Sequence, residues 1–541
     1  MRHRLSRRSF LRHIGVGAGA AAWAASGLKG VPTLASNREA PFNRLATSTF
    51  TYWTVLNQNA GATLKSYNEM LCYQEYEKKT GVHIDFQHIS DMGAQNTEQF
   101  NLLVASGQYP DFIEWDNWLT IAGGPGKYLK DNVIIKLNDL VEKNAPNLKK
   151  ILDANPDWRK EVVTDDGTLY CFPFLRGDVA LKVFQGPIIR KDWLDKVGLS
   201  TPTTVDEWHE MLVAFKKKDP NGKGDEVPFT SSLYSVPLNA FLLSHAFVGA
   251  WGIAMEWYQE NGVVKFGMVQ PEFKEFLKVM AQWYKEGLYD VDFPTMDTKL
   301  EDAKVTGNQL GSFIQNTGGG IGKYMGLMAK KDPNFELIAA PYPVLKKGDK
   351  PILGQRDTTF PGTGLTISSA CKNPEDAVKW ADFAYSDAGH MLFNFGVEGD
   401  TYTLENGYPK YTDKVMKDPK LALQQSMARF FRANWNGPFV QDKRYIEQYA
   451  KLPEQQDSLK IWAEPVNDKL MPPVTQTQDE SKKYASIMND ITTLRNEAII
   501  KTIVGQSSVD DWDGVVAQMK QIGIDDAIKL RQAALDRFKA R

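Results

Sequence analysis

Short strand-like segments and longer helix-like segments alternate along the chain, and this alternation restricts the fold more than any other feature of the sequence. Residues 49–55 are rich in β-branched and aromatic side chains, which is typical of a strand. A helical pattern over 70–79 ends before a glycine, and a second strand and helix follow at 82–86 and 97–106. Strands that alternate with helices predict a largely parallel sheet, and therefore an α/β fold.

The same pattern begins again in the middle of the chain. A strand is predicted around 187–189, followed by helices over 191–197 and 204–218, the second of which begins with a capping box of Thr204 and Glu207. With 541 residues, the chain is also longer than one hydrophobic core usually organises. We therefore expect two α/β lobes.

The N-terminal segment has the properties of an export signal. Residues 1–13 hold five arginines and no acidic residue, and an apolar run of small residues follows at 14–28. The sequence Ser-Arg-Arg-Ser-Phe-Leu at 6–11 resembles a twin-arginine signal, which directs folded proteins across a membrane. The apolar run is about 15 residues long, shorter than the roughly 20 that a permanent membrane helix needs, so we expect it to be cleaved.

The cleavage site determines where the mature chain begins. Thr33-Leu34-Ala35 fits the small-residue rule, which predicts a twin-arginine signal peptide at 1–35 and a polar linker at 36–48. No cysteine follows the apolar run, so a lipid anchor is not expected. The protein is therefore expected to be exported to the periplasm or the extracellular space.

Charge and cysteine content exclude several classes of protein. Residues 1–35 carry six of the 64 basic residues and none of the 66 acidic ones, so the mature chain has a net charge of −8. A mildly acidic protein is not expected to bind nucleic acid. Cys72, Cys171 and Cys371 stand far apart, which indicates free thiols and not a disulfide scaffold. We expect a monomer.

Five stretches, in this order along the chain, resemble one family. They are Ala-Ser-Gly-Gln-Tyr-Pro-Asp at 105–111, Asp-Gly-Thr-Leu-Tyr-Cys-Phe-Pro at 166–173, Arg-Lys-Asp-Trp-Leu-Asp-Lys-Val-Gly-Leu at 190–199, Pro-Thr-Thr-Val-Asp-Glu-Trp at 202–208 and Tyr-Lys-Glu-Gly-Leu at 284–288. Together they resemble family 1 of the extracellular solute-binding proteins of carbohydrate ABC importers, especially its long, oligosaccharide-binding members. The resemblance covers nearly the whole mature chain.

This resemblance implies a two-lobed periplasmic-binding-protein type II fold with crossing hinge segments. It also implies a cleft that closes on an oligosaccharide and delivery of that ligand to the permease subunits of an ABC transporter. By the same likeness, residues 49–175 and 307–362 form lobe 1, and residues 176–306 and 363–541 form lobe 2. The crossings are then expected near 174–179, 307–314 and 362–366.

Long members of the family often carry a calcium loop that resembles an EF-hand. The corresponding run here is Asp219, Asn221, Lys223, Asp225 and Glu226, whose side-chain oxygens at alternating positions suit Ca²⁺. The loop is two residues shorter than expected, and Lys223 stands where an oxygen-bearing side chain is expected. Either the Lys223 carbonyl serves as a ligand of a structural Ca²⁺, or the run is a solvated turn that ends a helix. No other cofactor is expected.

The chemistry of sugars suggests which residues line the cleft. A sugar presents C–H groups on one ring face and hydroxyls at its rim, so a binding site needs flat aromatic rings and planar hydrogen-bonding groups. The aromatic candidates, at strand ends or in loops, are Trp53, Trp115, Trp118, Trp251, Trp257 and Trp435. The polar candidates, near the expected crossings or after helices and strands, are Arg176, Asp178, Gln315, Arg356, Glu398 and Tyr402.

Each candidate also has a structural interpretation. A tryptophan is more often a core residue than a sugar platform, and Trp193, Trp208, Trp283 and Trp380 lie on apolar helix faces where the core interpretation is favoured. Arg176 and Arg356 could equally form salt bridges between the lobes, and Glu398 could be a surface charge.

Two other functions share part of this pattern. An exported glycosidase or lyase would need a pair of carboxylates or a Tyr/His/Arg set on facing elements, and the many acidic pairs do not identify one. The sequence contains no Gly-x-Ser-x-Gly, His-Glu-x-x-His, P-loop or Cys-x-x-Cys motif, so we expect a binding protein and not an enzyme. A sugar sensor that contacts a signalling receptor would use the same cleft.

Overall fold

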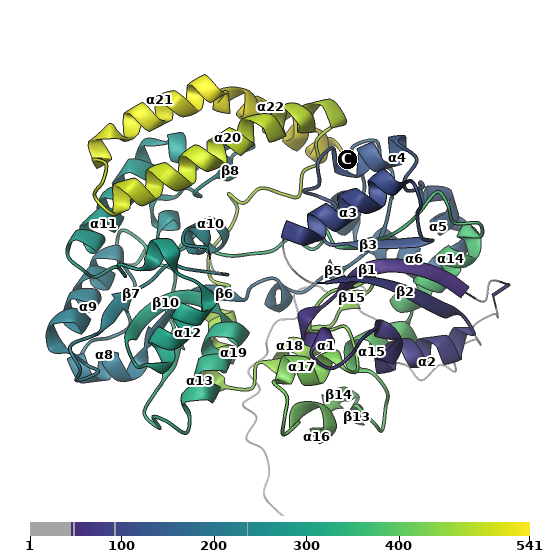
Figure 1. The fold of residues 1–541 in the computed structure, drawn as a ribbon, viewed down its shortest axis with the longest axis horizontal. Coiled ribbons are helices and arrows are strands. Elements are labelled where there is room, and N and C mark those ends of the chain that lie inside the picture. Colours follow the sequence, from purple (N-terminus) through teal and green to yellow (C-terminus); the bar gives the residue numbers. More distant parts are fainter. Residues whose placement is uncertain (1–44, 47–48, 91–93, 235) are drawn as a thin grey trace, which may run out of the picture.

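The computed structural model describes residues 45–46, 49–90, 94–234 and 236–541. The predicted signal peptide at 1–35 and most of the linker at 36–48 lie outside these residues. The described chain forms two α/β lobes side by side, and the C-terminal helices extend over both (Figure 1). Within these ranges, no helix combines the length and the apolar character that a membrane span requires.

The first lobe contains a five-stranded sheet in the order β2-β1-β3-β12-β4. Its strands are β1 (Thr49–Leu56), β2 (His83–Ser90), β3 (Phe112–Trp115), β12 (Gly364–Ile367) and β4 (Phe172–Pro173). β1 is parallel to β2 and β3, whereas β12 is antiparallel to β3 and β4. Its helices are α1 (Gln58–Gly61), α2 (Leu71–Thr80), α3 (Ala94–Ser106), α4 (Gly124–Lys130), α5 (Asn138–Asn144), α6 (Pro146–Ala154), α7 (Pro156–Val162), α14 (Pro374–Asp382), α15 (Asp387–Phe395), α16 (Asp413–Met416), α17 (Leu423–Ala428) and α18 (Lys443–Tyr449).

The second lobe contains a four-stranded sheet in the order β11-β6-β10-β7. Its strands are β6 (Gln185–Arg190), β7 (Val227–Phe229), β10 (Leu310–Asn316) and β11 (Leu337–Ala339). Its helices are α8 (Lys191–Val197), α9 (Val205–Lys218), α10 (Asn239–Ser244), α11 (Pro271–Lys285), α12 (Thr298–Thr306), α13 (Lys323–Met328), α19 (Pro453–Ile461), α20 (Gln478–Ile503), α21 (Trp512–Ile522) and α22 (Ile524–Ala540). Three two-stranded pairs complete the fold: β5 (Leu175–Arg176) with β15 (Val440–Gln441), β8 (Trp257–Glu260) with β9 (Val263–Phe266), and β13 (Tyr402–Glu405) with β14 (Tyr408–Tyr411).

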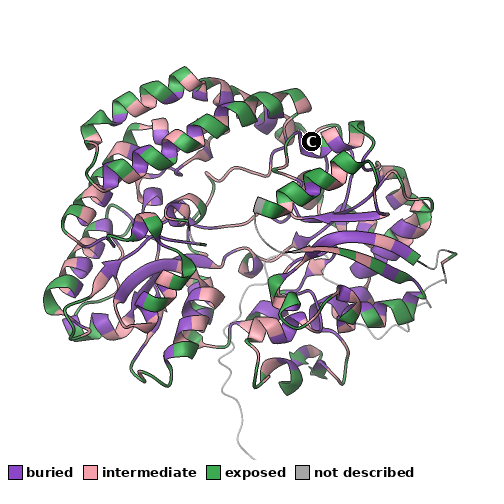
Figure 2. Ribbon diagram, viewed as in Figure 1, coloured by how far each residue is buried: buried purple, intermediate pink, exposed green. Residues whose placement is uncertain are grey.

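Local signals in the sequence explain these elements. Gly81, with φ of 71°, ends α2 in the left-handed conformation, and the predicted capping box of Thr204 and Glu207 begins α9. Every residue of β3 and β6 is buried, as expected for strands covered on both faces (Figure 2). The four tryptophans predicted to be core residues are 0 to 2% exposed, which confirms that interpretation.

The predicted assignment of segments to lobes is wrong at two strands. Residues 307–362 were expected in the first lobe, but β10 pairs with β6 and β7 in the second sheet. Residues from 363 onward were expected in the second lobe, but β12 pairs with β3 and β4 in the first sheet. The physical reason lies in close packing: a Cβ at Gly311 would lie 2.7 Å from the Trp193 ring and 2.8 Å from the Phe215 ring, so the glycine lets β10 pack beneath these second-lobe helices.

The two hydrophobic cores show where the chain crosses between lobes. The first core ends at Leu181, resumes at Phe360 and ends again at Ile446, while the second core occupies the intervening segment and resumes at Trp462. The crossings therefore lie near residues 181–183, 353–360 and 446–462. The second and third differ from the expected positions at 307–314 and 362–366.

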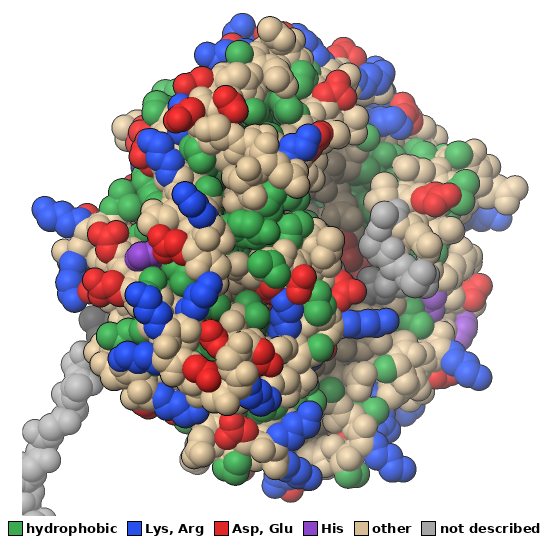
Figure 3. Space-filling model, turned by 60° about the vertical axis from the view of Figure 1, so that its left-hand side comes forward, with side chains coloured by type: hydrophobic (Ala, Val, Ile, Leu, Met, Phe, Trp, Pro, Cys, Tyr) green, Lys and Arg blue, Asp and Glu red, His purple; other side chains and the backbone are tan. Residues whose placement is uncertain are grey.

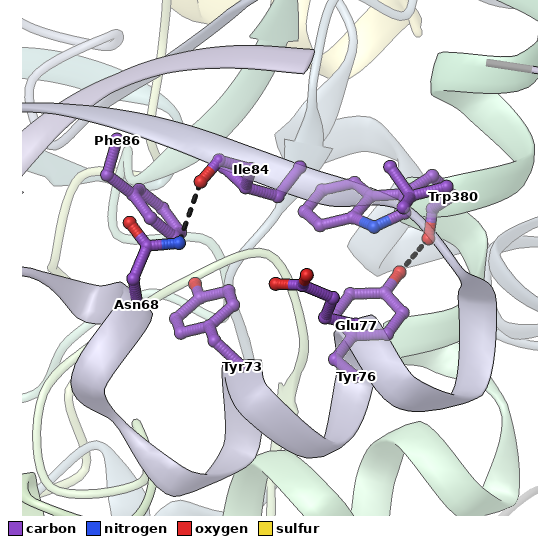
Figure 4. A pocket seen from close by; sticks show the side chains of 8 residues that line it. Asn68, Tyr73, Tyr76, Glu77, Ile84, Phe86 and Trp380 are labelled. Atoms are coloured by element: carbon purple, nitrogen blue, oxygen red, sulfur yellow. Dashed lines mark hydrogen bonds between the residues drawn. The ribbon is translucent and has the colours of Figure 1, made fainter. Parts of the chain in front are cut away.

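A small gap between α2 and β2 belongs to the first core (Figure 4). Tyr73 and Tyr76 on α2 face Ile84 and Phe86 on β2, and the hydroxyl of Tyr76 donates to the backbone carbonyl of Trp380. The gap has a volume of about 10 Å³, which is close to that of a single water molecule. It is therefore a packing defect and not a ligand site.

A buried ion pair joins the centre of the first sheet to a distant loop. Nη2 of Arg432 lies 2.6 Å from Oε1 of Glu114 on β3, and each side chain is 2% exposed. The hydroxyl of Tyr52 on β1 donates to Oε2 of Glu114 at 2.6 Å, and Nη1 of Arg432 donates to the hydroxyl of Tyr73 at 2.9 Å. Nε of Arg432 donates to the carbonyl of Asn436 at 2.7 Å, so the ion pair also fixes the loop that follows.

Removal of the carboxylate charge should strongly destabilise the fold. We expect Glu114→Gln to lower the free energy of unfolding by about 3 to 5 kcal/mol, because Arg432 would remain buried without a counter-charge. Urea unfolding followed by circular dichroism measures this change. The control is Glu75→Gln, which removes a carboxylate paired with the exposed Lys78 and should cost less than about 1 kcal/mol. Equal stabilities of the two variants would contradict the assignment.

Candidate functional site

The two sheets present strand ends to each other. In the first lobe, Gly364 at the start of β12 lies opposite Trp115, so the chain arriving from the second lobe enters beside the carboxyl end of β3. In the second lobe, Gln185 begins β6 opposite Asn316, the last residue of β10. Ligands of open α/β sheets bind beyond the carboxyl ends of the strands. The surface is hollowed between the lobes (Figure 3), and this interlobe cleft is the candidate site.

Polar side chains connect the first two crossings. Nη1 of Arg176 lies 2.5 Å from Oδ2 of Asp357, and Nε2 of Gln355 donates to Oδ1 of Asp357 at 2.9 Å. Oε1 of Gln355 accepts from the backbone N–H of Phe184 at 2.8 Å. Burial raises the pKa of Asp357, and the adjacent Arg176 guanidinium opposes this effect. Nε of Arg176 is buried without a partner.

Asp178 and Arg356, both predicted ligand contacts, lie in the same crossings. Oδ1 of Asp178 accepts from the backbone N–H of Ala180 at 2.9 Å, and Oδ2 lies 3.5 Å from Nζ of Lys443. Asp178 therefore also stabilises the crossing itself. Arg356 is half-buried, and together with burial, which is the larger cause, it lowers the pKa of Lys182. A direct role of either residue in ligand binding stays a prediction.

The second-lobe edge carries a cluster of amides around one tyrosine. Nε2 of Gln185 donates to the hydroxyl of Tyr234 at 2.7 Å, and Nδ2 of Asn316 donates to the same hydroxyl at 3.0 Å. Tyr234 is 51% exposed, and its φ of 53° is unusual for an aromatic residue. Oε1 of Gln185 is buried without a partner. Together these groups offer an exposed ring and unpaired polar atoms next to the crossings.

Sequence reasoning missed Tyr234 and Gln185. Their position at the ends of β6 and β7 was not recognised, because β7 is only three residues long. The one local signal was the polar run Thr230-Ser231-Ser232 directly after this apolar strand, which is typical of a ligand-facing strand end.

Gln315 was predicted as a ligand contact, but its amide is already engaged within the protein. Nε2 of Gln315 donates to Oε1 of Glu301 at 3.1 Å, and Oε1 accepts from the backbone N–H of Asn316 at 3.0 Å. Glu301 also accepts from the hydroxyl of Tyr324 at 3.0 Å. Burial raises the pKa of Glu301 to about 7, against the opposing effects of these two donors. The geometry thus makes Gln315 a residue that orients Asn316.

The first-lobe edge carries one of the predicted tryptophans. Trp435 was expected in the second lobe, but it follows Arg432 and lies half-buried on the first lobe. Next to it, Nδ2 of Asn436 donates at 3.0 Å to Oδ1 of Asp116, the residue after the carboxyl end of β3. Trp435 is therefore close to the strand end where a ligand is expected.

The other first-lobe tryptophans lie in the core. Trp115 and Trp118 are 1% and 0% exposed, so neither ring can serve as a sugar platform, and this prediction is wrong for both. Phe100 stacks on Trp115 with 4.8 Å between ring centroids, and Nε1 of Trp118 donates to the carbonyl of Gly364 at 3.0 Å. Trp53 is 6% exposed and packs against Phe100 and Trp115. Phe100 of α3 contacts all three rings, so this helix fills the face where they lie.

The remaining candidates lie at separate places. Trp251 is half-buried, with 5.8 Å between its ring centroid and that of Phe276 in an edge-to-face arrangement. Trp257 on β8 is also half-buried, and it contacts Phe266, Tyr484 and the guanidinium of Arg531. Glu398 is exposed, whereas Tyr402 at the start of β13 is 6% exposed and packs on Phe395. These four positions are not brought together with Arg176 and Tyr234 by any described contact.

The predicted metal loop is closed by its own hydrogen bonds. Oδ1 of Asp219 accepts from the backbone N–H groups of Lys223 and Gly224, both at 3.0 Å. Nδ2 of Asn221 donates to Oδ1 of Asp225 at 2.8 Å, and Nζ of Lys223 donates to the carbonyl of Gly307 at 3.0 Å. Oδ2 of Asp225 accepts from Gln309.

One oxygen of this loop has no partner, namely Oε2 of Glu226, which is buried. A Ca²⁺ ion needs six to eight oxygens. In the described part of the chain, no group of three or more His, Cys, Asp and Glu residues is placed to hold a metal. The loop as folded does not fit a calcium ion.

Comparison with known proteins gives a consistent result. The family model for bacterial extracellular solute-binding proteins matches residues 59–391. The fructooligosaccharide ABC transporter substrate-binding protein FusA of Streptococcus pneumoniae is 27% identical over 503 residues, 88% of this chain and 88% of FusA. Lipoprotein LipO of Bacillus subtilis is 27% identical over 350 residues, 61% of this chain and 64% of LipO.

Solved structures agree with this fold. Alginate-binding protein AlgQ2 without calcium ion superposes with a TM-score of 0.72 at 28% identity, over 92% of this chain and 100% of AlgQ2. An EF-hand mutant of FusA from S. pneumoniae in complex with fructo-nystose also has a TM-score of 0.72, at 25% identity, over 91% of this chain and 100% of that chain.

The buried Glu301 should make the stability depend on pH. The unfolded chain releases this proton near pH 4.3, whereas the folded protein retains it to about pH 7. The folded state therefore binds more protons in this window, and the stabilising contribution of neutral Glu301 is lost as the pH rises through it. We expect Glu301→Gln, which stays neutral, to be more stable than the wild type at pH 8 by on the order of 2 kcal/mol, with little difference at pH 4.

Urea unfolding at both pH values measures this effect. The matched control is Glu98→Gln, which changes an exposed residue of α3 and should leave the dependence of stability on pH unchanged. A Glu301→Gln profile parallel to that of the wild type would show that Glu301 is ionised in the folded protein at neutral pH.

Proposed function

The chain belongs to the family of bacterial extracellular solute-binding proteins, and on this premise we propose that it captures an oligosaccharide between its lobes and delivers it to the permease subunits of an ABC importer. FusA, which is similar over most of its length, is a fructooligosaccharide-binding protein of this kind. The observation that carries the proposal is the pair of facing edges, with Tyr234 and the amides of Gln185 and Asn316 on one side and Trp435 with Asn436 on the other.

These groups match the surface of a sugar. An aromatic ring packs against the C–H face of a pyranose or furanose ring, while planar amides and a guanidinium pair with neighbouring hydroxyls. Arg176 would supply a guanidinium for hydroxyl groups beside these edges, while Asp357 holds it in place. Contacts from both lobes are made together only when the cleft is closed. Ligand binding therefore shifts the population of the protein toward the closed form.

We infer that the protein binds its ligand without chemical conversion. Asp357 is held between Arg176 and Gln355, so its carboxylate is committed to connecting the crossings. The groups at the two edges include an indole, a phenol and amides, which recognise a sugar but do not exchange protons with a glycosidic bond near neutral pH, and the carboxylate of Asp116 accepts from Asn436.

Export is the second part of the proposal. The twin-arginine pattern within residues 1–35 supports secretion of the folded chain, and the lack of a cysteine after the apolar run supports release without a lipid anchor. LipO is named as a lipoprotein, so this chain and LipO would differ in how they are retained at the membrane.

We also propose that the loop at 219–226 folds without calcium. The ammonium of Lys223 bonds to the carbonyl of Gly307 and so connects the end of α9 to the turn between α12 and β10. Asp219 and Asn221 use their oxygens on backbone N–H groups of the same loop. The loop is thus held by hydrogen bonds within itself and to the neighbouring turn.

A thermal-shift screen tests the function. Ligand at 100 times its dissociation constant should stabilise the protein by about 2.7 kcal/mol. The panel should contain fructooligosaccharides, plant glucans and uronic-acid oligomers, each at a range of concentrations. Chromatography of the same mixtures should show intact sugar. Release of shorter products would favour an enzyme, and no stabilisation by any panel member would remove support for oligosaccharide binding.

Two tryptophan variants locate the site once a ligand is found. We expect Trp435→Ala to weaken binding by about 1 kcal/mol or more, a loss of roughly five-fold in affinity, because it removes the ring at the first-lobe edge. Trp257→Ala is the matched control, since its half-buried ring is covered by Phe266 and Tyr484. Isothermal titration calorimetry measures both affinities. A loss with Trp257→Ala and not with Trp435→Ala would place the sugar elsewhere.

Calcium should have no effect on stability. We expect the melting temperature to be the same in millimolar CaCl₂ and in excess chelator, because Asp219, Asn221 and Asp225 already use side-chain oxygens in hydrogen bonds. Lys223→Ala should cost about 0.5 to 1 kcal/mol through the lost bond to Gly307, whereas Lys417→Ala, which removes an exposed lysine of the first lobe, should be neutral. A calcium-dependent rise in melting temperature of the wild type would show that the loop rearranges to bind the ion.

A further inference from the structure

The three C-terminal helices are bound to the second lobe by apolar packing. Ile491 and Ile499 of α20, Trp512 and Met519 of α21, and Ile524 of α22 are all buried in the second core. Nε1 of Trp512 donates to the carbonyl of Met268 at 3.1 Å, which fixes the indole in that core. Contacts of this kind are lost only when the lobe itself unfolds.

The same helices reach the first lobe through polar groups. Both the start of α20 and the end of α22 lie beside the first lobe, near α4 (Figure 1). Asp165 in a first-lobe turn accepts from two guanidiniums: Nε of Arg537 at 2.5 Å and Nη2 of Arg541 at 2.5 Å. Arg541 also donates from Nη1 to the carbonyls of Lys160 and Val163 at 2.8 and 2.7 Å.

The guanidiniums are themselves held in place from the second-lobe side. Nη1 and Nη2 of Arg537 donate to the two carboxylate oxygens of Glu480 at 2.8 and 2.5 Å, and the hydroxyl of Thr475 lies 3.4 Å from Asp165. The Arg541 side chain is 2% exposed and that of Asp165 is 19% exposed, so these charges are shielded from solvent more than ordinary surface pairs. We call Asp165, Thr475, Glu480, Arg537 and Arg541 the C-terminal latch.

A second contact lies beside the latch. The backbone N–H of Gly123, which precedes α4, donates to the hydroxyl of Ser481 at 2.8 Å, and Lys130 lies 3.4 Å from Gln478. All these lobe-to-lobe contacts at the C-terminal helices are hydrogen bonds or ion pairs. The interface therefore differs in kind from the apolar attachment of the same helices to the second lobe.

We propose that the C-terminal latch sets the balance between the open and closed forms of the protein. When the lobes separate about the crossings, the helices move with the second lobe, and Asp165 moves with the first. A separation that carries Asp165 away from these helices breaks the ion pairs, so the latch favours the arrangement of the lobes described here, with its contacts formed, and slows the escape of a bound ligand. This role of the latch in ligand release rests on the function proposed above, whereas its effect on the shape of the protein does not.

Small-angle scattering of the ligand-free protein tests the latch directly. We expect Asp165→Asn and Arg541→Gln to increase the radius of gyration, because each removes one partner of the latch ion pairs. The control is Lys483→Gln, which removes a charge of α20 that pairs with Asp526 on α22 and does not contact the first lobe. This control should match the wild type.

A kinetic measurement with a ligand from the thermal-shift screen gives the second readout. Biolayer interferometry should show dissociation about three- to ten-fold faster for Asp165→Asn and Arg541→Gln than for Lys483→Gln, since opening precedes release. Circular dichroism confirms that each variant is folded, and Arg541→Gln replaces Asp165→Asn if the latter is not. Unchanged scattering in both latch variants would overturn the proposal and leave the contacts a purely structural brace. Failure of all sugars to bind would instead count only against the proposed function.

Discussion

The buried guanidinium of Arg432 needs a counter-charge and hydrogen-bond acceptors, and several separate parts of the first lobe supply them. A charge that is 2% exposed is stable only when counter-charge and hydrogen bonds surround it. Glu114 comes from the central strand, Tyr73 from α2 and the Asn436 carbonyl from the loop that carries Trp435. The requirement to satisfy one charge therefore positions an edge of the binding cleft. The second lobe has buried charged pairs of its own, Arg190 with Asp192 and Lys304 with Asp290.

The sequence was sufficient to predict local structure and the class of fold. Helix ends at Gly81 and the capping box of α9 depend on neighbours within a few residues, and these were predicted correctly. Assignment of strands to sheets depends instead on contacts far apart in sequence. β10 joins the second sheet because Gly311 admits Trp193 and Phe215, and β12 joins the first because Gly364 lies against Cys171. No local pattern near either strand contains that information.

The candidate site shows the same division. A tryptophan at a strand end can face the cleft or the covering helix, and α3 decides this for Trp115 by placing Phe100 on its ring. Gln315 was expected in the first lobe but lies on β10 of the second, and its amide is used by Glu301, a residue fourteen positions earlier on another element. Tyr234 was missed because its importance comes from Gln185 and Asn316, which reach it across the sheet. The chemistry of sugars predicted which types of residue to look for. Which individual residues face the cleft depends on tertiary packing, which the local sequence does not contain.

The hydrogen bond from Lys223 to Gly307 bears on where in the cell the protein can fold. A chain that crosses the membrane after folding must complete its structure in the cytosol, where free calcium is kept scarce. A loop that needed calcium in order to fold would reach the export machinery without its final structure. With an ammonium group of its own bonded to Gly307, this loop can close before export, in the compartment where the chain is made. Under the export route and the calcium-free folding proposed above, the second lobe would fold in the same way on either side of the membrane.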